Sequence, residues 1–312
     1  MMIISASRRT DIPTYYSEWL INRLKEGFVY VRNPMNVHQI SKISLSPDVV
    51  DGIVFWTKNP VPMLNKLDKL QDYAYYFQFT VNSYGKDIEA NIPIKNDIIV
   101  PAFKELSRKI GSEKVIWRYD PIMLTSKYTI DYHVNYFGEL AKRLSGYTQK
   151  CVISFVDFYR NTQTHLKDLD MLPLGEKEMY ELAERLVEIA TKNNLIVESC
   201  AEKINLEQFG IQHGHCIDCA LFEKILNCKM NLSKDKNQRL ECGCMESIDI
   251  GAYNTCKNGC RYCYANFSQT TVDKNTGAHN PESPLLFGEV LPDDKITERK
   301  TISLKNGQIS LF

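Results

Sequence analysis

The chain has 312 residues, enough to bury a large core in one α/β barrel or in two modest domains. Its 38 basic and 38 acidic side chains give a formal net charge of +0, which gives no sign of a generally basic nucleic-acid-binding surface. No apolar run is long enough to cross a membrane, and residues 1–10 lack a signal-peptide pattern, so we expect a cytoplasmic protein with reduced cysteines.

Short β-branched and aromatic runs alternate along the chain with amphipathic stretches, which is typical of βα units that build a parallel sheet. We expect strands at residues 2–7, 52–57, 75–81, 114–119, 150–157, 195–200 and 247–252. Apolar residues that recur every three or four positions predict helices at residues 15–25, 101–109, 129–144 and 176–192. This order predicts one α/β domain over residues 1–270 and a C-terminal tail over residues 271–312.

Each of the first six predicted strands ends in polar or charged residues. These strand-end segments are residues 7–11, 57–60, 80–82, 118–121, 157 and 199–202. Functional residues of parallel α/β barrels gather at the carboxyl ends of the strands, so the six segments indicate one shared active-site mouth. A solvated strand end is the alternative for any single segment.

The seventh predicted strand leads into a loop, residues 253–267, that holds a cysteine triad. Cys256, Cys260 and Cys263 have CxxxCxxC spacing, and three soft thiolates this close together suit an iron–sulfur cluster. Three cysteines on a four-iron cube leave one iron without a protein ligand, free to bind the amino and carboxylate groups of a small molecule. A zinc knuckle or a chance spacing is the alternative.

Residues 256–266, Cys-Lys-Asn-Gly-Cys-Arg-Tyr-Cys-Tyr-Ala-Asn, resemble the signature of the radical S-adenosylmethionine superfamily. The resemblance implies a [4Fe–4S] cluster, S-adenosylmethionine, and a reductant such as flavodoxin or ferredoxin. In most of that superfamily the cysteines follow the first barrel strand, whereas here most of the chain precedes them. We therefore expect a circularly permuted, partial (β/α) TIM-like barrel with a Cys-rich C-terminal segment, in which the last strand lies beside the first.

Two short motifs carry a second resemblance. Thr-Lys-Asn-Pro at residues 57–60 and Arg-Tyr-Asp-Pro-Ile at residues 118–122 are similar to segments of spore photoproduct lyase and its relatives, in a different order. The whole chain, from Ile-Ser-Ala-Ser-Arg-Arg-Thr-Asp-Ile-Pro to Asp-Ile-Gly-Ala-Tyr-Asn-Thr-Cys, resembles a family of unknown function. These resemblances imply a fold and a cofactor, name no substrate, and leave nucleic acid open as one.

A second cysteine group lies within a Cys-rich insertion, residues 200–246. We expect a four-thiolate site for zinc or a second [4Fe–4S] cluster, formed by Cys200, Cys216, Cys242 and Cys244. Cys219 is the reserve ligand, and His213 or His215 is a further alternative. Cys151 and Cys228 fit small buried hydrophobes.

S-adenosylmethionine would need an acceptor for its amino group and cations for its carboxylate. The predicted cofactor-binding residues are Asp11 as acceptor, Arg8, Arg9 and Lys58 as cations, and Arg118 and Asp120 as further candidates. The Gly-Gly-Glu segment usual in the superfamily is absent, so these roles rest on chemistry and position. Buried Arg–Asp pairs that close a barrel rim are the alternative.

The predicted function is a radical enzyme in which the cluster reduces the sulfonium and releases a 5′-deoxyadenosyl radical. Tyr119, Tyr253, Tyr264 or a spare cysteine is predicted to return a hydrogen atom to the substrate radical. The rival hypotheses are a non-catalytic zinc or iron–sulfur protein that binds nucleic acid or a partner, and an electron carrier without an organic substrate.

The C-terminus carries one further motif. Residues 308–312, Gln-Ile-Ser-Leu-Phe, resemble the peptide with which many bacterial replication and repair proteins dock into the sliding clamp. The alternative is that Leu311 and Phe312 pack on their own domain.

Overall fold

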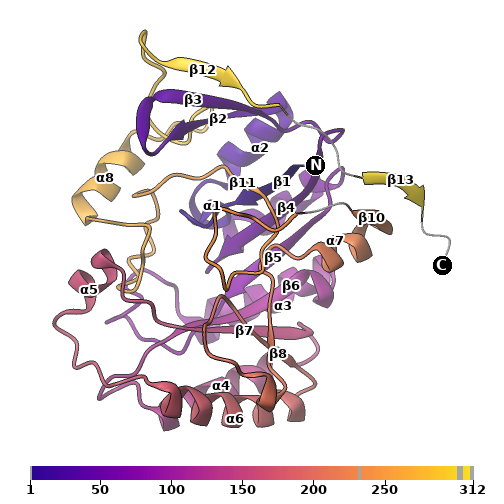
Figure 1. Ribbon diagram of the computed structural model, residues 1–312. Helices are drawn as coiled ribbons and strands as arrows, with labels where there is room; N and C mark the ends of the chain where they lie inside the picture. Colours follow the sequence, from indigo (N-terminus) through magenta and orange to yellow (C-terminus); the bar gives the residue numbers. More distant parts are fainter. Residues whose placement is uncertain (1, 231–232, 301–304, 310–312) are drawn as a thin grey trace.

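The computed structural model describes residues 2–230, 233–300 and 305–309. Its centre is an eight-stranded sheet in which all neighbouring strands are parallel, in the order β11-β1-β4-β5-β6-β7-β8-β9 (Figure 1). In chain order these strands are β1 (Met2–Ala6), β4 (Val50–Thr57), β5 (Tyr75–Thr80), β6 (Val115–Ile122), β7 (Lys150–Phe155), β8 (Ile196–Ser199), β9 (Gln212–His213) and β11 (Ile248–Asp249). Within the described residues no ladder joins β9 to β11, so the sheet is open and forms no closed barrel.

The predicted α/β class is confirmed, and each of the seven predicted strands overlaps a strand of this sheet. The last strand lies beside the first: Ile4 of β1 is in register with Ile248 of β11, and Ser5 with Asp249. β11 is much shorter than the predicted strand at residues 247–252, because the chain leaves the sheet directly after Asp249. The two-residue β9 was not predicted.

One face of the sheet is covered by a layer of helices, mainly α2 (Ser17–Glu26), α3 (Val100–Ile110), α4 (Ile130–Leu144) and α6 (Glu176–Lys192). The other helices are α1 (Ile12–Tyr15), η1 (Val61–Leu70), η2 (Lys95–Ile99), η3 (Ser112–Lys114), α5 (Arg160–Leu166), η4 (Glu207–Phe209), α7 (Cys219–Leu226) and α8 (Gln269–Gly277). The helix predicted at residues 15–25 is interrupted at Tyr16, which ends α1 and precedes α2. Asp11 starts α1 by accepting a hydrogen bond from the backbone N–H of Thr14.

The two faces of the sheet have different coverings, because successive side chains of a strand point to opposite sides. On one side Phe55, Phe77 and Trp117 pack under the helices in the main core. On the other side strand residues such as Tyr76 pack against the Cys-rich insertion, which forms a second buried cluster. There the ring of Phe222 in α7 lies directly on Gly52, so close that a Cβ at this glycine would be 2.1 Å from the ring.

The remaining strands lie outside the main sheet. β2 (Phe28–Asn33) and β3 (Asn36–Ser44) form an antiparallel hairpin, and β12 (Lys295–Glu298) joins β3 in parallel. β10 (Cys228–Met230) pairs antiparallel with β13 (Lys305–Ile309). No helix of the described part of the chain is long and apolar enough to span a membrane.

The predicted C-terminal tail packs in part against the domain. The indole Nε1 of Trp19 in α2 donates to the carbonyl oxygens of Ser283 and Leu285, at 2.9 and 3.1 Å. The backbones of Gln308 and Ile309 lie in β13. The other three residues of the predicted clamp-docking peptide, 310–312, lie outside the described residues.

Candidate functional site

The triad loop, residues 253–267, lies beside the carboxyl end of β1. The Tyr264 hydroxyl donates to the carbonyl oxygen of Arg8 at 2.8 Å, and the Tyr16 hydroxyl donates to that of Thr255 at 2.5 Å. The strand that delivers the loop is fixed in the same way, because Asp249 accepts hydrogen bonds from Ser5, Ser7 and the backbone N–H of Arg8. Residues separated by about 240 positions in the sequence therefore form one edge of the site.

Asp11 connects three parts of this site. One carboxylate oxygen accepts from the backbone N–H of Lys58 at 2.8 Å and from Nδ2 of Asn258 at 3.1 Å, and the other accepts from Thr14. The side chain is buried, and burial raises the pKa of Asp11 although these donors oppose the rise. Asp11 thus holds the ends of β1 and β4 to the triad loop, with both oxygens already engaged.

A buried ionic network lies next to the triad. Glu89, which is 2% exposed, accepts from Lys58 Nζ at 2.9 Å, forms an ion pair with Lys95 Nζ at 2.6 Å and accepts from the hydroxyl of Tyr262. Its backbone bridges that of Cys260. Burial alone would raise the pKa of Glu89, but the two lysines lower it to about 2, so the carboxylate is ionised.

Sequence reasoning identified Lys58 in this network and missed its partners. Glu89 lies in an irregular stretch after β5, where a single acidic residue carries no periodicity or motif that would distinguish it from a surface residue. Tyr262 stands directly before Cys263 in the triad run, where nothing in the sequence predicts its contact with Glu89. Lys58 Nζ lies over the ring of Tyr262, 5.3 Å from its centroid, so the triad loop adds a cation–π contact to the network.

The triad sulfurs lie in a partly buried environment. Burial raises the pKa of all three thiols, that of Cys260 to about 12, while the positive charge of Lys58 acts in the opposite direction at Cys260 and Cys263. Thiols in such surroundings stay protonated near neutral pH. The loop is therefore poorly suited to present a free reactive thiolate.

The second cysteine group, Cys200, Cys216, Cys242 and Cys244, gathers near Arg8. The sulfurs of Cys200 and Cys216 are 3.1 Å apart, and the thiol of Cys244 interacts with those of Cys216 and Cys242. Cys219 starts α7, and the charges that act on its thiol are those of Asp218, Glu223 and Lys229, with none of the four sulfurs among them.

Arg8 and Arg118 both lie near the second cysteine group. Arg118 donates from Nη1 to the sulfur of Cys216 at 2.8 Å and is held by Asp120, with an Nη2 to Oδ2 distance of 2.5 Å. Burial would lower the pKa of Arg8, but the charges of Cys244 and Cys216 raise it. Of the predicted cofactor-binding residues, Arg118 thus contacts a cysteine of the second group and Arg8 lies near two of them. Arg118 and Asp120 already form an ion pair with each other.

Arg9 and the three predicted catalytic tyrosines have different surroundings. The guanidinium of Arg9 lies over the ring of Tyr253, 5.0 Å from its centroid. Tyr264 is 43% exposed and borders the site through its bond to Arg8. Tyr119 points to the opposite face of the sheet from Arg118, where it is buried under α4 and its hydroxyl lies 2.8 Å from His133 Nδ1. The structure does not bring Tyr119 together with either cysteine group.

Several buried polar atoms of this region lack a hydrogen-bond partner among the described residues. They are Arg8 Nη2, Thr10 Oγ1, Asn82 Oδ1 and Asn266 Oδ1. Asn82 is 2% exposed and is oriented by its own Nδ2, which donates to the carbonyl oxygen of Asp120 at 2.7 Å. Buried polar groups are nearly always satisfied, so these atoms indicate where a ligand could complete the site.

Two other features lie outside this site. Within the described residues, one set of three His, Cys, Asp or Glu side chains has all its ligand atoms within 4.8 Å of one another, and it comprises His38, Asp293 and Asp294. Its Asp294 is already paired with Arg32 at 2.7 Å, which disfavours a cation there.

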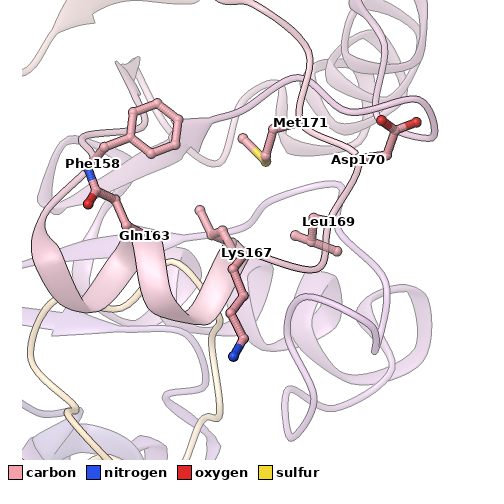
Figure 2. Close-up of a pocket in the computed structure, with 7 residues that line it drawn as sticks. Phe158, Gln163, Lys167, Leu169, Asp170 and Met171 are labelled. Atoms are coloured by element: carbon pink, nitrogen blue, oxygen red, sulfur yellow. The ribbon is translucent and has the colours of Figure 1, made fainter.

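A surface pocket lies between α5 and the segment that follows it, as Figure 2 shows. Its volume is about 410 Å³, and it is lined by Phe158, Gln163, Leu166, Lys167, Leu169, Asp170 and Met171. The triad loop anchors the same segment, because Arg261 donates to the carbonyl oxygen of His165 and pairs with Asp168. The pocket contains none of the predicted site residues.

The fold and this site define an α/β protein with an open parallel sheet and two groups of cysteines near its strand ends. The chain belongs to the family described as Domain of unknown function (DUF1848), whose model matches residues 3–265. That description assigns no activity.

Other comparisons add little. No curated protein matches the chain. Among solved structures it is similar to one from a study of the pneumococcal virulence factor StrH and of N-glycan recognition and hydrolysis, with 11% identity and a TM-score of 0.25. The match covers 64% of this chain and 52% of that one, so the chain spans about half the length of that structure. A likeness this weak carries no argument.

Proposed function

We propose that the chain is a radical S-adenosylmethionine enzyme whose triad, Cys256, Cys260 and Cys263, binds a [4Fe–4S] cluster. The observation that carries the proposal is the position of the triad loop at the carboxyl end of β1, in the hydrogen-bond network of Asp249, Arg8 and Asp11. Carboxyl ends of parallel strands are where α/β barrels carry their active sites. A loop with this cysteine spacing in that place matches the superfamily that the sequence resembles.

The strand order supports a permuted relationship to that superfamily. β11 occupies an edge of the sheet, feeds the triad loop and neighbours β1, and the remaining strands follow from β1 in chain order. If β11 is taken as the first strand, the cysteine loop follows the first strand and β1 is the second, which is the order in most of the superfamily. We infer a circularly permuted, partial (β/α) barrel on this basis.

The residues around the triad fit the cofactor. When bound, the cluster supplies the electron that cleaves the sulfonium of S-adenosylmethionine into methionine and a 5′-deoxyadenosyl radical. The unpartnered atoms Arg8 Nη2, Thr10 Oγ1 and Asn82 Oδ1 offer donors and an acceptor for the polar groups of that ligand. Asp11, with its oxygens engaged, holds the loop in position.

The ionic network has a complementary role. Lys58, balanced by Glu89, supplies a positive charge beside Cys260 and Cys263 and thereby stabilises their thiolates. Tyr262 and Glu89 fix the loop to the segment after β5. Tyr253 and Tyr264 border the mouth and remain the proposed hydrogen donors, and a flavodoxin- or ferredoxin-like protein remains the proposed reductant.

The proposal is tested by replacing each triad cysteine with alanine and measuring 5′-deoxyadenosine after anaerobic reconstitution with iron, sulfide and dithionite. We expect each variant to lose the product while remaining folded by circular dichroism. Cys228→Ala is the matched control, because this cysteine lies in β10 outside both groups and should leave the product unchanged. Product at the wild-type level from any triad variant would contradict the proposal.

The same preparation distinguishes the rival functions. One zinc per chain and no iron at the triad would favour a non-catalytic metal module. A reducible cluster in a chain that does not bind S-adenosylmethionine would favour an electron carrier. Nucleic acid remains a candidate substrate, which product formation in the presence of oligonucleotides would test.

A further inference from the structure

Three separate segments converge on the second cysteine group. Cys200 follows β8, Cys216 lies in the loop after β9, and the Cys-Gly-Cys run at residues 242–244 comes from the end of the Cys-rich insertion. Long-range backbone bonds hold the segments together: Gly214 N–H donates to the carbonyl of Ser199 at 2.7 Å, and Met245 N–H to that of Ile217 at 3.2 Å.

The backbone at Cys216 is held in place by neighbouring side chains. The hydroxyl of Tyr76 and Nε2 of Gln78 both donate to the carbonyl oxygen of Cys216, at 2.7 and 3.0 Å, and so fix the backbone that carries this sulfur. Gly243 lies against the exposed ring of His215, where an added Cβ would be only 2.6 Å from the ring, so a larger residue there would displace this side chain.

Two positively charged arginine side chains, Arg8 and Arg118, lie near this group and would stabilise thiolate sulfurs. Arg118 is 6% exposed and donates to Cys216. The guanidinium of Arg8 stacks on the ring of Trp56, 5.1 Å from its centroid, and its charge interacts with Cys244 and Cys216. Asp120 is a counter-ion of Arg118, and Asp249 lies near Arg8. Each of the two arginines also interacts with cysteine sulfurs of this group. Thiolates on a metal centre would supply the remaining negative charge.

We propose that Cys200, Cys216, Cys242 and Cys244 bind a second iron–sulfur cluster of the [4Fe–4S] type, ligated entirely by thiolates. Four cysteine ligands leave no open iron, so this centre would be redox-active without binding S-adenosylmethionine. The inference rests on the convergence of the four residues and does not depend on the chemistry proposed for the triad.

The choice of a cluster over zinc rests on charge and not on the sulfur positions. The sulfurs of Cys200 and Cys216, at 3.1 Å, are closer than the roughly 3.8 Å between two thiolates on one tetrahedral zinc with Zn–S bonds of about 2.3 Å, so these side chains would turn outward when either centre binds. Two guanidiniums beside four thiolates suit an iron–sulfur cluster, because its negative charge grows on reduction, whereas zinc has no redox chemistry.

Arg118 has a specific part in this arrangement. A hydrogen bond from a cation to a ligand sulfur stabilises the reduced and more negatively charged state of a cluster, which raises its reduction potential. Arg118 is thus a positioning and tuning residue, and its effect should appear in the potential while the iron content stays the same.

The first test isolates the second centre. A triple variant, Cys256→Ala/Cys260→Ala/Cys263→Ala, purified anaerobically should retain about four iron and four sulfide per chain and give an electron paramagnetic resonance signal on one-electron reduction. A folded triple variant that contains zinc in place of iron, or no metal, would overturn the proposal. Because the triad is absent from this variant, the result is independent of radical chemistry.

The second test keeps the triad and alters the second group. Cys216→Ser/Cys244→Ser should lower the iron content to about half of the wild-type value. Arg118→Met in the triad-free variant should leave the iron content unchanged and shift the midpoint potential to a more negative value, whereas the surface control Arg185→Met should leave the potential unchanged. An unchanged iron content in the double cysteine variant would refute the assignment of these ligands.

Discussion

Replacing Glu89 with glutamine tests the buried network beside the triad most directly. The substitution keeps the shape of the side chain and removes its negative charge. In the protein this charge is 2% exposed and lies 2.9 Å from Lys58 Nζ and 2.6 Å from Lys95 Nζ. Glu89→Gln therefore leaves two buried ammonium groups facing each other without a counter-ion.

The magnitude follows from this geometry. Removing one partner of a buried ion pair costs about 3–5 kcal/mol, because the remaining charge is desolvated and uncompensated. Lys95 keeps some contact with solvent, with 20% of its side chain exposed, and Lys58 has 14%. This partial exposure places the expected loss at the lower end, about 3 kcal/mol.

The assay is urea unfolding of the reduced, metal-free chain, followed by the fluorescence of Trp19, Trp56 and Trp117. Glu89→Gln should move the midpoint to a lower urea concentration, and Glu89→Gln/Lys58→Met should recover most of the loss because it removes one of the unpaired cations. Equal midpoints for wild type and Glu89→Gln would refute the reasoning. So would a double variant no more stable than the single one.

Two further predictions concern regions away from the cysteines. Burial lowers the pKa of His133 from about 6.5 to about 4, so between these pH values the unfolded chain takes up a proton that the folded chain does not. The free energy of unfolding should therefore fall by about 3 kcal/mol as the pH drops from 6.5 to 4. His133→Gln should flatten this part of the plot of urea midpoint against pH, and a plot parallel to that of the wild type would contradict the assigned cause. Deleting residues 308–312 should abolish micromolar binding to a sliding clamp in surface plasmon resonance and leave the urea midpoint unchanged. A lower midpoint would mean that the segment instead stabilises its own domain, where β13 pairs with β10.

Local sequence signals located the elements of the main sheet and the triad loop. The alternation of apolar runs and amphipathic stretches is a property of short windows, and it predicted the α/β class and the helix layer. The spacing of Cys256, Cys260 and Cys263 is equally local. The prediction that the last strand lies beside the first came from the assumed order of strands in a barrel. The pairing of β1 with β11, in which Ile4 is in register with Ile248, confirms it.

The face of the sheet that each strand residue occupies could not be predicted. The strands are apolar on both sides, because helices cover one face and the Cys-rich insertion covers the other, and such strands lack the alternation that reveals a buried side. Tyr119 and Arg118 were therefore assigned to the same mouth. Only the packing of Tyr119 under α4 and of Arg118 against Cys216 separates them.

Sequence alone determined which thiols are candidates for a metal site, because cysteine identity and close spacing are written in the chain. The tertiary structure decided how those residues are used. Glu89 becomes the counter-ion of Lys58 beside Cys260, and Arg8 contacts the triad loop and interacts with Cys216 and Cys244, only because segments far apart in sequence meet at the strand ends. Such contacts depend on how the strands and loops pack, and no local pattern encodes that packing.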